Sequence, residues 1–138
     1  MPYKVELANG VVLVNTIDEI HSYDEDFMNN SHSIDAHSRS MTGMYKNYEY
    51  EIILRRMGSM RYFCGYIKNV EGVNGHDERL YIPHGGYTAN FGFDCAHAGD
   101  FIFLVNNDFI DQDATYKSFS FVQNECFKII DSIIEIVW

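Results

Sequence analysis

The sequence predicts an α+β fold, in which a mostly antiparallel sheet is packed by a C-terminal amphipathic helix. Short β-type runs, rich in aromatic and β-branched residues, are separated by turn signals along most of the chain. Their connections are short, which favours antiparallel pairing. The last segment instead repeats its apolar residues at helical spacing. Strands followed by a helix are typical of the α+β class.

The first strands are predicted to form a hairpin. Lys4–Leu7 and Val11–Val14 are β-type runs on either side of Ala8-Asn9-Gly10. Asn-Gly between apolar runs is a strong hairpin signal, because both residues tolerate the backbone angles of a tight turn. Residues 18–26 are acidic, and residues 28–43 are rich in Ser and Asn without a steady apolar period. We expect a long surface loop there, with room for a helical turn.

The middle of the chain predicts two further strands. Tyr48, Tyr50, Ile52 and Leu54 alternate with polar residues, which favours a strand. A helix over residues 45–57 competes with this interpretation. Gly58-Ser59 is a plausible turn into a second β-type run at residues 60–67.

Loops and strands are expected to alternate further along the chain. Residues 71–78 have loop composition, and residues 79–82 form a short β-type run. Residues 101–105 are fully apolar and short enough for a buried strand, and the polar, acidic residues 106–115 should form a loop.

The C-terminal segment has the clearest periodicity. Ser120 and Gln123 have the spacing of a capping box and predict the start of the helix. Cys126 lies on the apolar face and is expected to be a small buried core residue. The charged residues Glu125, Lys128, Asp131 and Glu135 are assigned to the opposite face. The apolar face comprises Val122, Cys126, Ile129, Ile130, Ile133 and Val137.

Composition limits the classes of function. A chain of 138 residues, 46% hydrophobic and 15% aromatic, suits a single domain over residues 1–138. The formal net charge is −10, so direct binding to a nucleic acid backbone is not expected. An acidic chain suits a basic protein partner, and the alternative is that the charge only keeps the protein soluble. We expect no membrane span and no signal peptide. The three cysteines form no CxxC pair, and their odd number suits a reducing cytoplasm.

Residues 83–100, PHGGYTANFGFDCAHAGD, concentrate the reactive side chains of the chain between permissive glycines. Zinc prefers four ligands drawn from Cys, His and carboxylate. His76 lies one predicted strand upstream and would return to the same end of the sheet. A four-ligand site is therefore predicted from His76, His84, His97 and either Cys95 or Asp94, with Asp100 as a further oxygen donor.

Other interpretations of this stretch stay open. His84 could end a strand before a Gly-Gly turn, Cys95 could be core, and Asp94 and Asp100 could cap turns. The spacing matches no standard zinc finger or deaminase signature. An open coordination position would instead make a metal-dependent hydrolase, with Asp94 or Asp100 as base. A third hypothesis is a small-molecule binding protein, with a pocket for a nucleotide signal near His84.

Four motifs carry a resemblance. CGYI at residues 64–67, Gly75-His76, PHGGYT at residues 83–88 and FGFDCAHAGD at residues 91–100 resemble a family of small phage and prophage proteins. The chain is similar to type II-A anti-CRISPR proteins, and the likeness covers only its middle part. It implies a protein that binds a Cas nuclease of a type II CRISPR system and blocks loading of target DNA, without catalysis and with a structural zinc.

The charge of the chain is compatible with that implication. Such nucleases hold their heteroduplex in a positively charged channel. The acidic residues 18–26 and 108–113 are therefore candidate contacts with a partner, and the alternative is that both segments are solvated surface.

Overall fold

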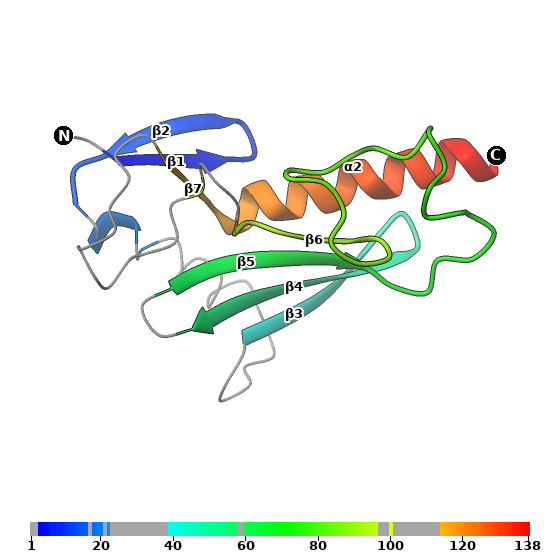
Figure 1. The fold of residues 1–138 in the computed structure, drawn as a ribbon, viewed down its shortest axis with the longest axis horizontal. Coiled ribbons are helices and arrows are strands. Elements are labelled where there is room, and N and C mark those ends of the chain that lie inside the picture. The colour runs from blue at the N-terminus through cyan, green and yellow to red at the C-terminus, as the bar shows by residue number, and fades with distance from the viewer. Residues whose placement is uncertain are drawn as a thin grey trace.

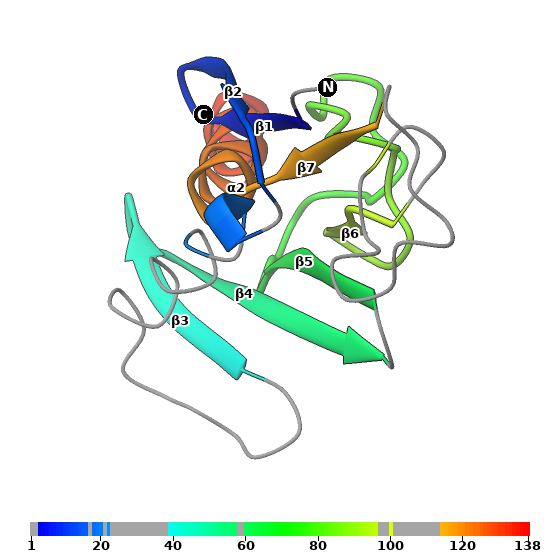
Figure 2. The same ribbon diagram turned by 90° about the vertical axis from the view of Figure 1, so that its left-hand side faces the viewer.

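The structure is a computed structural model that describes residues 3–16, 18–20, 22, 39–57, 60–96, 100 and 114–138. It confirms the predicted α+β class: two sheets accompany one long C-terminal helix, α2 (Phe119–Val137). The helix lies along one face of the larger sheet, and the smaller sheet stands at the N-terminal end of the helix (Figure 1). Figure 2 looks along α2 from that end, with the larger sheet below it.

The smaller sheet has the strand order β2-β1-β7. β1 (Tyr3–Leu7) and β2 (Gly10–Val14) pair antiparallel and confirm the predicted hairpin, which closes at Leu7 and Gly10. β7 (Thr115–Lys117) pairs parallel with β1 and leads into the helix. The loop prediction for residues 106–115 was therefore wrong at Thr115. Residues 101–113, including the expected strand at 101–105, lie outside the described part of the chain.

The larger sheet has the order β3-β4-β5-β6, and its neighbours all pair antiparallel. β4 (Tyr48–Met57) and β5 (Met60–Ile67) confirm both predicted central strands, and the competing helix is wrong. Residues 58–59, predicted as their turn, lie outside the description. β6 (Gly92–Asp94) adds a short strand beside β5.

β3 (Arg39–Tyr45) corrects the sequence prediction, which placed residues 28–43 in a loop. Its alternation is weak because Gly43, which has no side chain, follows Met41 on the inward side, and the apolar Met44 takes an outward position. Met41 is buried opposite Ile52, whereas Thr42 and Met44 are exposed. The hydrogen bonds of β4 hold this sequence as a strand, so tertiary pairing decided what local propensity did not.

The chain between β5 and β6 is irregular. This confirms the loop predicted at residues 71–78, but the strand predicted at residues 79–82 was wrong. The N–H of Arg79 bonds to the Asp77 carboxylate, and the N–H of Tyr81 donates to Ser132 Oγ on α2, 3.0 Å away. These backbone groups are satisfied by side chains, one of them from the helix, and not by a neighbouring strand.

The helix begins two residues earlier than predicted. Ser118 is the N-cap, and its Oγ accepts a bond from the N–H of Phe121. Ser120 Oγ instead accepts from the N–H of Ala8 in the hairpin turn, so the predicted capping box was wrong. Gln123 reaches across to the sheet and donates to the Tyr50 hydroxyl. Both side chains of the expected box therefore join the helix to distant segments, Ser120 to the hairpin turn and Gln123 to β4.

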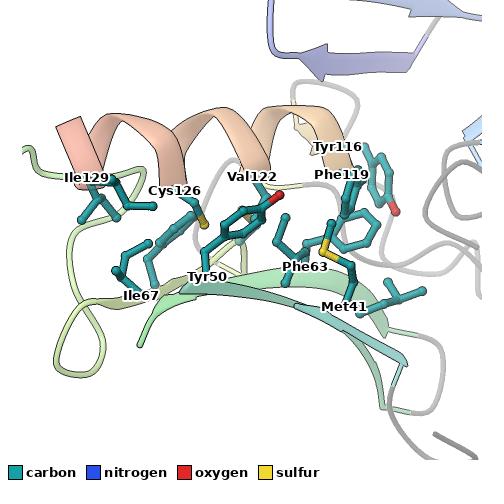
Figure 3. Close-up of a cluster of buried hydrophobic side chains, with 14 of the residues drawn as sticks. Met41, Tyr50, Phe63, Ile67, Tyr116, Phe119, Val122, Cys126 and Ile129 are labelled. Carbon is teal, nitrogen blue, oxygen red and sulfur yellow. The ribbon is translucent and has the colours of Figure 1, made fainter. Parts of the chain in front are cut away.

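The core lies between α2 and the inner face of the larger sheet. Figure 3 shows Val122, Cys126 and Ile129 reaching down from the helix towards the sheet. Cys126 is fully buried, as predicted, but Val137 is 43% exposed despite its place on the predicted apolar face. Among the described residues, no helix combines the length and apolar character that crossing a membrane requires.

Candidate functional site

The structure brings together two of the predicted ligand residues, His84 and Asp100. Nε2 of His84 lies 2.8 Å from Oδ1 and 3.0 Å from Oδ2 of Asp100. Lys117 Nζ lies 3.2 Å from the same Oδ1. The side chains of Asp100 and Lys117 are 1% and 8% exposed, whereas that of His84 is 25% exposed. We call these three residues the central cluster.

Three separate segments position the central cluster. His84 stands in a turn that Gly85 and Gly86 complete at positive φ, and the N–H of Gly86 bonds to the Pro83 carbonyl. The Gly-Gly turn expected after His84 is therefore present, but the strand that His84 was expected to end is not. Asp100 forms a parallel bridge with Thr115 at the start of β7, and Lys117 ends the same strand. The cluster thus ties the central loop to the smaller sheet.

A second buried carboxylate, Glu125, lies next to the cluster on α2. It accepts bonds from the Tyr81 hydroxyl at 2.7 Å and from the N–H of His84 at 3.1 Å. Lys128 Nζ stands 3.6 Å away. Burial and the bond to Glu125 raise the pKa of Tyr81. The Tyr87 hydroxyl in turn donates to the Tyr81 carbonyl.

The sequence prediction placed Glu125 on the exposed helix face, and that was wrong. The signal that could have found it is its spacing: Glu125 lies three residues after Val122 and four before Ile129, at the border of the apolar face. Lys117 was missed as well. A lone lysine in a short β-type run gives no sign that it will be buried beside a carboxylate from another segment of the chain.

Cys95 and Asp94 make contacts of a different kind from those of His84. Cys95 is buried and free, and its N–H bonds to the Phe63 carbonyl. Burial raises its thiol pKa well above the usual value. Asp94 Oδ1 accepts from the N–H of Ala96, the turn-capping role that the sequence left open.

His76 is exposed and lines a separate hollow of about 330 Å³ together with Tyr87, Asn90 and Phe91. His97 lies outside the described residues. Within the part of the chain that the structure describes, no three His, Cys, Asp or Glu side chains gather closely enough to hold a metal. The zinc site stays a prediction.

The central cluster can orient an imidazole for one of two tasks. Asp100 is the partner of Nε2 of His84 and fixes the orientation of the ring. Metal-bound histidines commonly give their other nitrogen to a carboxylate in this way, and so do histidines that act as general bases. In both cases Asp100 would be the partner that holds the ring, not a ligand itself.

Comparison with known proteins identifies no relative of this chain. A scan against protein-family models, a search of curated proteins and a search of solved structures each found no match. Function is therefore inferred from the residues and the geometry of the chain itself.

Proposed function

We propose that the protein is a phage-derived binding protein that inhibits a type II Cas nuclease by occupying the surface that takes up target DNA. Its formal net charge of −10 and the resemblance of its central motifs to anti-CRISPR proteins both support this function. An acidic surface competes with a nucleic acid for a basic channel, and charge complementarity speeds the encounter.

The observation that carries the proposal is how the motif residues are used within the fold. Asp100 is buried between two basic side chains, His84 and Lys117. Glu125 is buried as well and bonds both to the His84 backbone and to Tyr81. These contacts join the central loop, the smaller sheet and the helix, so we assign the motif an architectural role and look for the partner surface elsewhere.

The predicted contact segments are only partly described. Of residues 18–26 and 108–113, the structure describes residues 18–20 and 22. Asp18 and Glu19 are exposed there, and Glu19 Oε2 accepts bonds from the N–H groups of Asn15 and Thr16. Because Glu19 holds the local turn, it is left unchanged in the test below.

The test measures binding to a Cas nuclease–guide RNA complex and inhibition of DNA cleavage. One variant replaces the acidic residues 24–26 by lysine, and a second replaces Asp108, Asp111 and Asp113. A matched control carries the same charge change at exposed sites outside both segments, Glu71, Glu78 and Glu135.

We expect at least one segment variant to lose inhibition by about tenfold or more, mainly through slower association that depends on salt. The control should inhibit like the unaltered protein. Unaltered protein that neither binds the nuclease nor protects DNA would refute the function. Full inhibition by both segment variants would refute a charge-led interface.

A metal-dependent hydrolase is the second candidate, and the His84–Asp100 pair favours it because the ring remains 25% exposed. Elemental analysis with His84→Ala and His97→Ala variants separates the two candidates. Zinc lost together with folding stability supports the structural role. Zinc and turnover of a phosphoester or ester substrate lost at unchanged stability would support the hydrolase.

A further inference from the structure

β2 is an open, apolar edge. It is the outer strand of the smaller sheet, and Figures 1 and 2 draw it at the rim of the fold with no described strand beyond it. Its sequence is GVVLV, and Val11, Val12 and Leu13 are 52%, 36% and 63% exposed. An exposed apolar edge strand is a template for pairing with another strand.

The register shows which backbone groups face outwards. The Glu6 carbonyl of β1 accepts from the N–H of Ser118 on the β7 side, 3.1 Å away. Glu6 stands opposite Val11, so this is a pair without mutual backbone hydrogen bonds, and the N–H and C=O of Val11 point away from β1. Because backbone groups alternate in direction along a strand, the N–H and C=O of Leu13, opposite Lys4, also point away from β1. Within the described residues, neither Val11 nor Leu13 has a backbone partner at this edge.

β2 lacks the features that usually protect an edge. Residues 7–17, LANGVVLVNTI, carry no charge, although the chain has 20 acidic and 10 basic residues. β3, an outer strand of the larger sheet, begins at Arg39 and is followed by Lys46. Charges of that kind, prolines or bulges discourage pairing between edges. β2 has none of them, so its edge is suited to being paired.

The pattern of β2 is complementary to itself. In an antiparallel two-fold pairing centred on Val12, Val11 faces Leu13 of the second copy, and the two Val12 residues face each other. Every outward backbone group then finds a partner, and aliphatic side chains meet on both faces of the sheet. No like charges meet along this seam, despite the charge of −10 on each copy.

We infer that β2 is a self-association edge, through which two copies of the chain form a two-fold dimer with one continuous sheet. A basic partner would find no carboxylate on this strand, whereas a second copy matches it in shape and polarity. The inference does not depend on the proposed Cas target. A strand of five residues is about 17 Å long, so the contact is small and we expect a weak, reversible dimer.

Analytical ultracentrifugation of the full chain, over roughly 5 to 500 µM, tests the dimer. Unaltered protein should shift from monomer to dimer within this range. Leu13→Lys should weaken the association at least about tenfold, because it places a charge in the seam. Leu13→Pro should also weaken the association, because proline lacks the outward N–H that would bond the second copy. The hairpin should remain intact, since this N–H bonds nothing in β1. Ile82→Lys, at an apolar residue that is 72% exposed elsewhere, is the matched control and should dimerise normally.

Cross-linking tests the register. The three native cysteines are buried, so an introduced thiol reports its own position. Val12→Cys should form a disulfide-linked dimer with oxidised glutathione, whereas Val11→Cys should not, because its neighbour across the axis is Leu13. Circular dichroism confirms that each variant is folded. A protein that stays monomeric at the highest concentration overturns the inference and leaves a strand of another protein as the occupant. Equal cross-linking at positions 11 and 12 overturns the two-fold register.

Discussion

Removing the Asp100 charge should destabilise the protein strongly. The Asp100 carboxylate is 1% exposed and holds Lys117, itself 8% exposed, at 3.2 Å. Asp100→Asn keeps the shape of the side chain but leaves the Lys117 ammonium buried without its counter-charge. Breaking a buried ion pair by removing one partner typically costs about 3–5 kcal/mol.

That loss is a large part of the stability of a domain, which is about 5–15 kcal/mol in total. A chain of 138 residues should lose about 3–5 °C in Tm for each kcal/mol, which gives a fall of about 9–25 °C. The double variant Asp100→Leu/Lys117→Met should recover most of the loss. It removes both charges of the pair together, and apolar replacements of buried ion pairs are often neutral or better.

Urea unfolding at pH 7, followed by circular dichroism, measures Asp100→Asn and also the double-mutant cycle of the unaltered protein, Asp100→Leu, Lys117→Met and their double variant. Asp131→Asn is the matched control, because it makes the same chemical change in the exposed pair with Lys46 and should alter stability little. Asp100→Asn within about 0.5 kcal/mol of the unaltered protein would refute the reasoning. A double variant as unstable as the single one would also refute it. If the cluster is architectural, the double variant should keep its inhibition of the Cas nuclease.

Two further predictions concern packing and pH. Gly65→Ala should cost about 1–3 kcal/mol in urea unfolding, because its Cβ would lie 2.7 Å from the Phe93 ring and 2.8 Å from Cys126 Sγ, both fully buried. Gly75→Ala is its control, because the added Cβ would lie 3.4 Å from Asn90 Oδ1, at an ordinary contact distance. Equal losses of stability in the two variants would contradict the packing argument. Burial and a nearby carboxylate raise the pKa of Tyr87 from 10.0 to about 12. The unfolded chain therefore releases this proton first, and stability should fall as pH rises from 10 towards 12; unfolding midpoints of Tyr87→Phe should lack that part of the fall.

The sequence alone determined the fold class, the hairpin, the strands β4 and β5, and the helix with its buried Cys126. Each of these rests on a local pattern: an Asn-Gly turn, alternation over a strand, or apolar residues at helical spacing. Local patterns failed where side chains bond across the fold. Ser120 has a good capping sequence, yet it bonds the hairpin turn, so Ser118 caps the helix. β3 has a poor strand pattern, yet β4 pairs with it.

The candidate site divides in the same way. The sequence singled out His84 and Asp100 as reactive groups near glycines, and the structure places them in contact. Only the tertiary structure revealed Lys117 and Glu125, because both become buried through partners from distant segments. The cost of burying a charge is met by a counter-charge or a donor that the fold supplies, and that partner's position follows from topology. A local sequence window contains the charge but not the partner, and so it cannot tell a solvated residue from a buried one.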